Sequence, residues 1–229
     1  MMNKAEKIIT MIVAVVGGGA GLWGAYTSHD ASKFVQPFDE REQIVKSFST
    51  QIESAEIRKD IPEVNRVRLL LEKYEEGWRS ARKIAKLVEP LESLKTAKLS
   101  NSESHNIREL LNSWSKSEDR VSISPKTLGA AYYAVGDYRQ AIEQLSLVSA
   151  SNNDPSANAL KAVSFAGLAS SELDKEVATG YQISALDLFL DAKNEAPNKT
   201  QELSEFAATS DGLKKLLEEK DIELKNGSR

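Results

Sequence analysis

The chain has 229 residues, 41% of them hydrophobic, which is enough for one globular unit of ordinary size or two small ones. Its 30 Lys and Arg against 34 Asp and Glu give a formal net charge of -4, which provides no general attraction to phosphate backbones and argues against a nucleic-acid binder. There is no cysteine and there are only two histidines, so disulfides, thiolate zinc sites and histidine metal clusters lack their ligands. We expect no metal and no cofactor.

The N-terminal region carries an uncharged run over residues 8–26, about as long as a helix needs to cross the hydrocarbon core of a bilayer. Lys4 and Lys7 precede the run, while Trp23 and Tyr26 fall near its far end, where amphipathic rings favour the headgroup boundary. We predict that residues 1–26 are a short tail and a single transmembrane anchor. The alternative is a cleaved signal peptide with residues 8–16 as its apolar core.

The nearest positive charges lie before the run, which favours a cytoplasmic N-terminal tail. We therefore expect a single-pass protein of a bacterial inner membrane, with its body in the periplasm or outside rather than in the cytoplasm.

Small residues recur four apart within the run, at Gly17 and Gly21 and at Ala20 and Gly24. Such spacing lets two helix backbones approach closely in lipid. It predicts a packing face for a homo-oligomer or for the membrane helix of a partner. The alternative is that glycine is simply common in membrane helices.

Helical periodicity dominates the region after residues 27–39, which we interpret as a juxtamembrane linker. Within residues 40–114, one amphipathic helix ends before Pro62, and a second has apolar residues from Val64 to Val88 in steps of three and four, as in a coiled coil or long hairpin. Pro90 should end or kink it. Its charged positions predict a solvated face of mixed sign rather than a basic binding patch. A loop over 93–104 and a short helix over 107–114 follow, and without any period-two alternation the body is predicted to be all-α.

The C-terminal region, residues 115–229, begins with the helix-start signal of Ser124 and Pro125. Its next apolar and small residues fall at the spacings of a known repeat: Leu128, Gly129, Tyr132, Gly136, Tyr138, Ala141, Leu145 and Val148. This segment closely resembles the tetratricopeptide repeat. A less regular second unit has Ala185, Phe189, Ala192 and Pro197, so the resemblance covers about 124–197. For that unit we predict a first helix over 156–173 and a long connector over 174–180, followed by capping helices over 200–208 and 211–225.

The resemblance implies a binding scaffold in which the first helix of each pair lines a groove for a peptide or a helix of another protein. The family's spacing directs four residues into that groove: Lys126, Ala130, Tyr133 and Ala134. Ala130 stands where the carboxylate-clamp subgroup of the family has asparagine, which argues against binding of chaperone C-terminal tails.

The predicted function is a membrane-anchored scaffold that binds or assembles other proteins and is not an enzyme. Its acidic pairs lie in ordinary solvated charge runs, and acid-base catalysis needs such pairs in a cleft. The alternative is a subunit of an oligomeric membrane complex, pore-like or stator-like, built through the glycine-rich membrane helix and the seam over 64–88.

Replacing both Gly17 and Gly21 with Ile tests the packing face. The side chains fill the groove between the two glycines but keep the run apolar, so membrane insertion should persist and association should weaken. Native mass measurement in detergent reports the oligomer. An unchanged oligomer would show that the glycines are ordinary membrane-helix residues.

Overall fold

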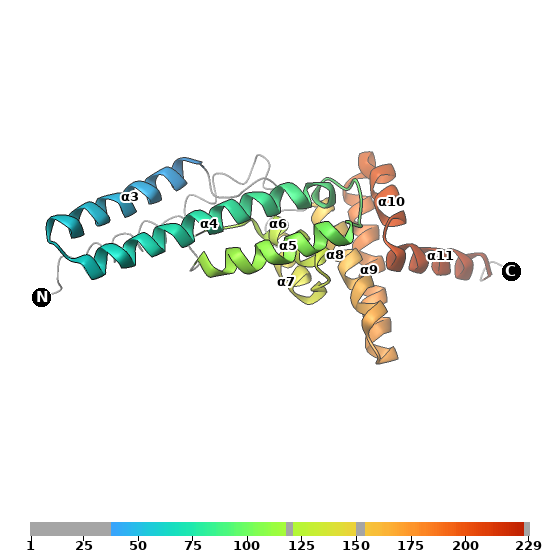
Figure 1. The fold of residues 1–229 in the computed structure, drawn as a ribbon. Coiled ribbons are helices and arrows are strands. Elements are labelled where there is room, and N and C mark those ends of the chain that lie inside the picture. Colours follow the sequence, from blue (N-terminus) through green and yellow to red (C-terminus); the bar gives the residue numbers. More distant parts are fainter. Residues whose placement is uncertain (1–37, 118–120, 150–153, 227–229) are drawn as a thin grey trace, which may run out of the picture. The chain divides into compact units, whose positions relative to one another are not determined.

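The computed structural model describes residues 38–117, 121–149 and 154–226, and these ranges are helical with no strand, which confirms the all-α prediction. None of their helices is both long and apolar enough to cross a membrane. The predicted membrane helix over 8–26, with Gly17, Gly21 and Gly24, lies outside the described residues. Figure 1 shows the elements, which are α3 (Phe38–Ile57), α4 (Ile61–Glu92), α5 (Asn101–Trp114), η2 (Ser115–Ser117), α6 (Pro125–Ala134), α7 (Tyr138–Ser149), α8 (Pro155–Ser171), α9 (Lys175–Glu195), η3 (Pro197–Lys199), α10 (Thr200–Ala208) and α11 (Asp211–Asn226).

The first two helices form an antiparallel hairpin because the sequence between them ends one helix and starts the next. Lys59 adopts a left-handed φ of 58°, and the amides of Lys59 and Asp60 bond back to the last turn of α3. The Asp60 carboxylate then accepts the amide of Glu63, and a proline occupies the first turn of α4. The hairpin buries Phe48 against Tyr74, with ring centroids 6.0 Å apart. α4 ends two residues after Pro90.

The helix α5 starts earlier than the sequence pattern predicts, so the loop predicted over 93–104 is wrong for its last four residues. The reason is a capping box: the Ser100 hydroxyl accepts the Glu103 amide, and the Glu103 carboxylate accepts the Ser100 amide. Ile107 and Leu111 are buried from this helix. The Ser113 hydroxyl donates to Glu76 at 2.6 Å, which joins the end of α5 to α4.

Two helical hairpins follow, α6 with α7 and α8 with α9. Gly136, at a φ of 82°, makes the turn between α6 and α7. Gly167 of α8 lies so close to the Tyr138 ring of α7 that a Cβ there would stand 2.6 Å from it, which shows how tightly successive hairpins stack.

The long connector predicted over 174–180 is wrong. The chain between α8 and α9 is only Glu172–Asp174, because the Asp174 carboxylate accepts the amides of Glu176 and Val177 and starts α9 at Lys175. The capping helices α10 and α11 fall within a residue of their predicted ranges.

One hydrophobic core joins the two predicted regions, 40–114 and 115–229. It runs from Phe48 of α3 through α4, α6 and α8 to Leu213 of α11. In the described residues, the helical hairpin and the repeat-like segment therefore share their buried side chains rather than forming separate cores.

The crossing of α6 and α7 yields a stability test. Gly129 lies where an added Cβ would stand 2.6 Å from Leu145 Cγ and 3.2 Å from the Ala141 carbonyl oxygen. Gly129→Ala should therefore lower the free energy of unfolding by about 1–3 kcal/mol, since overpacking outweighs the gain in helix propensity. Urea denaturation of the full chain measures the change.

Gly180 of α9 provides the matched control, because a Cβ there meets nothing within 4 Å. Gly180→Ala should stabilise the chain by about 0.5–1 kcal/mol through helix propensity alone. Equal effects of the two substitutions would contradict the close crossing.

Candidate functional site

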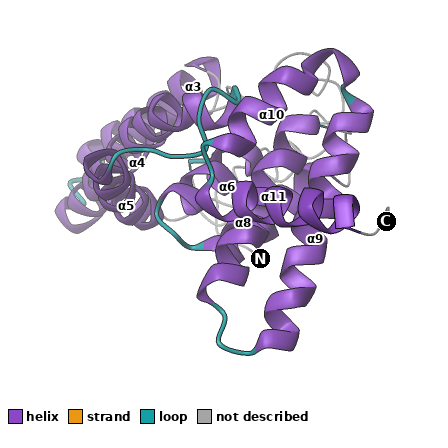
Figure 2. Ribbon diagram, turned by 90° about the vertical axis from the view of Figure 1, so that its right-hand side faces the viewer, coloured by secondary structure: helices purple, strands orange, loops and turns teal. Residues whose placement is uncertain are grey.

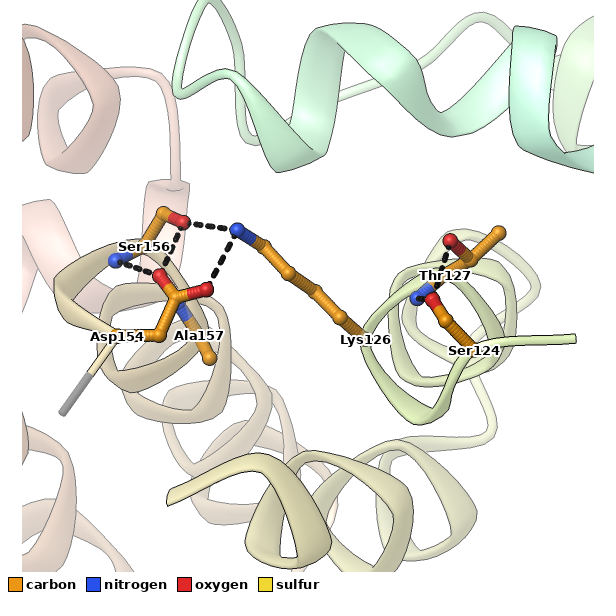
Figure 3. A network of polar contacts seen from close by, with 6 residues as sticks. All are labelled: Ser124, Lys126, Thr127, Asp154, Ser156 and Ala157. Carbon is orange, nitrogen blue, oxygen red and sulfur yellow. Dashed lines mark hydrogen bonds and ion pairs between the residues drawn. The ribbon is translucent and has the colours of Figure 1, made fainter. Parts of the chain in front are cut away.

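Buried polar side chains gather where the end of α4 meets the starts of α6 and α8. Lys126, in the first turn of α6, extends to the start of α8, where its ammonium lies 2.8 Å from Asp154 Oδ2 and also donates to the Ser156 hydroxyl (Figure 3). The other oxygen of Asp154 accepts the amides of Ser156 and Ala157 and caps α8. One carboxylate thus holds both the helix start and the lysine.

The second half of this polar cluster surrounds Glu92, in the last turn of α4. The Ser124 hydroxyl accepts the Thr127 amide and donates to the Thr127 hydroxyl at 2.8 Å. Thr127 in turn hydrogen-bonds the Glu92 carboxyl, which is only 7% exposed. Among the described residues, Glu92 Oε1 has no hydrogen-bond partner.

The two carboxyl groups of the polar cluster have opposite pKa shifts. Burial would raise the pKa of Asp154, but the charge of Lys126 and hydrogen bonds from Lys126, Ser156 and the Ala157 amide outweigh it and hold that pKa below its usual value. Burial raises the pKa of Glu92 to about 7, against the Thr127 hydrogen bond and the more distant charge of Lys126. Asp154 is therefore the ionised partner of Lys126, whereas Glu92 keeps its proton to a higher pH than an ordinary glutamate.

The four residues predicted to line a groove lie inside the described fold. Lys126 is 7% exposed and Ala130 is fully buried, while Tyr133 and Ala134 are partly buried. The Tyr133 hydroxyl donates to the Ala97 carbonyl at 2.6 Å. The segment between α4 and α5, residues 93–100, therefore packs on α6 together with α4 itself.

The repeat spacing could not predict that other parts of the chain cover this face of α6. It describes a single repeat and not the elements that pack on it. The segment is tied at its other side too, because the Ala97 amide donates to the Thr209 hydroxyl at 2.6 Å. A peptide could reach the buried Lys126 and Ala130 only after the elements packed on α6 moved away. Partner binding through these four residues stays a prediction.

The apolar seam over 64–88 also packs against other helices of the same chain. Its side chains Val64, Val67, Tyr74, Trp78, Ala81 and Val88 are buried, and α4 packs against α3, α5 and α6. In this structure the seam therefore presents little apolar surface to a second copy.

Sequence reasoning did not identify Glu92 or Asp154 as members of a cluster. A signal existed for Asp154, because Asp154 and Pro155 repeat the cap-then-proline pattern of Ser124 and Pro125. No local pattern marks Glu92, whose burial depends on α6, more than thirty residues along the chain.

No other described feature forms a stronger site. A shallow depression of about 190 Å³ between α8, α9 and α11 is smaller than ordinary ligand pockets. In the described ranges, no three His, Cys, Asp or Glu residues come together to hold a metal ion.

The chain matches no family model, and comparisons with curated proteins and with solved structures find no similar protein. The tetratricopeptide resemblance therefore depends on the residues of 124–197 alone.

Glu92→Gln tests the electrostatics of the polar cluster. The folded pKa of Glu92, about 7, exceeds its unfolded value near 4.5, so the folded state binds the proton more tightly. The free energy of unfolding should then fall as pH rises from about 4.5 to 7 and level off above, by about 3 kcal/mol in full. Gln cannot ionise, so the variant should lose this decline. Thermal melts measure the effect: the melting temperature of the variant, relative to that of the natural chain, should be higher at pH 8 than at pH 5.

The exposed Glu89, one turn earlier on the same helix, supplies the control Glu89→Gln. That variant should follow the natural chain at both pH values. If the stability of Glu92→Gln and of the natural chain changed with pH in parallel, ionisation of Glu92 would not be the cause of the decline.

Proposed function

We propose that this protein is a non-catalytic scaffold of tetratricopeptide-like helical hairpins, anchored to a membrane through residues 8–26, which binds a partner protein through the outer face of α9. The stack of hairpins with one continuous core supports a rigid body suited to presenting a surface. Lys126 and Glu92 of the polar cluster are each only 7% exposed, which favours a structural role for this cluster over a catalytic one.

The observation that carries the proposal is a pair of exposed aliphatic side chains on the outer face of α9, with the exposed Asp187 between them. Ile183 is 55% exposed and Leu190 is 50% exposed, seven residues apart and hence on one side of the helix. Leu173, in the loop just before α9, is 96% exposed. Figure 2 shows this loop at the free end of the α8 and α9 hairpin. Exposed apolar side chains that share one side of a helix are candidates for a protein contact, whereas singly scattered ones are ordinary.

The spacing also indicates the kind of partner. Two aliphatic side chains two helical turns apart fit an amphipathic helix or an apolar groove, the arrangement that recurs when helices recognise one another. This surface replaces the inner face of α6 as the proposed contact, because α4 covers that inner face. Partner recognition would then need no movement of the core.

The alternative function, an oligomeric membrane complex, now has less support from the described residues. The seam over 64–88 is buried inside the chain. Such a complex would depend on Gly17, Gly21 and Gly24 alone.

Ile183→Glu with Leu190→Glu tests the α9 face in the full chain. Two charges on the contact would be buried at a cost, so crosslinking in native membranes should lose the partner's band by about tenfold or more. The fold should persist because both side chains point away from the core. Quantitative mass spectrometry of the crosslinked product measures the loss.

Leu69→Glu is the matched control, since Leu69 is 52% exposed on α4 and receives the same change. It should retain the crosslinked product. The proposed α9 contact would be contradicted if the double variant retained the crosslinked product, or if the control lost it equally. Resistance of the chain to alkaline extraction from the membrane tests the anchor separately.

A further inference from the structure

Four cationic side chains lie together on an exposed face of α4. This basic patch consists of Arg79, Arg82, Lys83 and Lys86, at spacings of three, one and three residues that place all four within one side of the helix. Each is exposed, and none forms an ion pair with a described residue; Arg79 donates to the Glu75 carbonyl and Arg82 stacks on Trp78.

Acidic residues precede the basic patch on α4, and two of them, Glu75 and Glu76, bond to other helices. Both oxygens of Glu75 accept from Arg41, at 2.6 and 2.9 Å, and Glu76 accepts from Ser113. Glu89, one turn beyond the patch, remains exposed and limits it on that side. Of the acidic residues before the patch, Glu75 is paired with a cation, whereas Glu72 and Glu76 keep their charge; the face is therefore of mixed sign up to Glu76 and positive from Arg79 to Lys86.

The basic patch lies beside the point where the described chain begins. Arg41, in the first turn of α3, lies 4.6 Å from the centre of the Trp78 ring, and Arg82 lies 5.0 Å from the same ring. Figure 1 shows the start of α3 alongside the middle of α4. Only residues 27–37 separate this point from the apolar run over 8–26, and eleven residues span at most about 40 Å.

We propose that the basic patch docks the helical body onto the anionic headgroups of the membrane that holds residues 8–26. The inference rests on the proposed membrane anchor. Tethering by a short linker keeps the local concentration of the surface high, so four exposed cations suffice where a free domain would bind weakly. Attraction of Lys and Arg to anionic lipid extends over about a Debye length, within reach of long side chains on an exposed helix. The same tether favours lipid over nucleic acid as the occupant, because the chain itself would hold the membrane close to the patch.

The experiment uses the full chain reconstituted into vesicles. Because the chain has no cysteine, Ser93→Cys, at the exposed end of α4, takes a single fluorophore. Quenching by headgroup-labelled lipid reports contact with the bilayer surface. Quenching should be about twofold or more stronger in vesicles with about one-third phosphatidylglycerol than in vesicles of phosphatidylcholine alone. This difference should fall in about 0.5 M NaCl, because salt screens the attraction.

Replacing all four patch residues with Gln should abolish the rise with anionic lipid. The matched control changes four exposed lysines elsewhere to Gln, which alters the net charge equally and should retain the rise: Lys175, Lys199, Lys214 and Lys215. Lys83→Gln with Lys86→Gln gives a milder variant that leaves Trp78 and its stacked arginines intact, and it should lose part of the rise.

The outcomes separate the docking from the anchor. A chain that floats with vesicles after alkaline treatment, yet shows equal quenching with and without the patch, overturns the docking and leaves the anchor. A chain that does not float overturns both. Equal loss of the rise in the control variant, or loss of the rise when single-stranded RNA is added at matched charge, also overturns membrane docking by the patch.

Discussion

The burial of one face of α4 along its whole length is the constraint on which the other described elements depend. A helix of 32 residues is about 48 Å long, and no single neighbour in the chain can cover it. α3 covers the first half, with Phe48 against Tyr74, and α5 and α6 cover the second. Since Ile84, Val88 and Leu91 must leave water somewhere, α6 is drawn onto α4, and its inner face closes.

The polar cluster follows from this packing. Once the end of α4 lies against α6, the Glu92 carboxyl enters the core beside Thr127 and not far from Lys126. A buried ion pair contributes little net stability, because desolvation offsets its attraction, but breaking it leaves a charge without compensation. We therefore interpret the contact of Lys126 with Asp154 and Ser156 as a fixed link between the first turns of α6 and α8. This link sets how the two hairpins stack rather than how strongly they do so.

The surfaces left open differ in chemistry. The outer face of α9 exposes the aliphatic Ile183 and Leu190 with Asp187 between them, whereas the face of α4 beyond Trp78 is cationic. The two belong to different helices of one continuous core, so a partner on α9 and a membrane on α4 would be held by the same rigid body. The proposed scaffold and the proposed docking therefore fit together without requiring any rearrangement of the described helices.

The sequence by itself determined where most helices begin and end, because these signals act within a few residues. Ser124 with Pro125 marked the start of α6, and the periodicity from Val64 to Val88 marked α4. Where a local signal was overlooked, as with the Asp174 cap, the predicted connector was wrong, although the information lay in the chain.

Only the tertiary structure decided which faces of those helices remain open. Lys126 meets Asp154 across 28 positions, Tyr133 meets Ala97 across 36, and Ala97 meets Thr209 across 112. No periodicity of three or four residues carries that information. The same holds for the surroundings of the basic patch, where Glu75 is paired with Arg41, which reaches α4 from another helix. Local spacing fixes the face of a helix to which a side chain belongs, whereas burial and charge pairing depend on what packs against that face from distant parts of the chain.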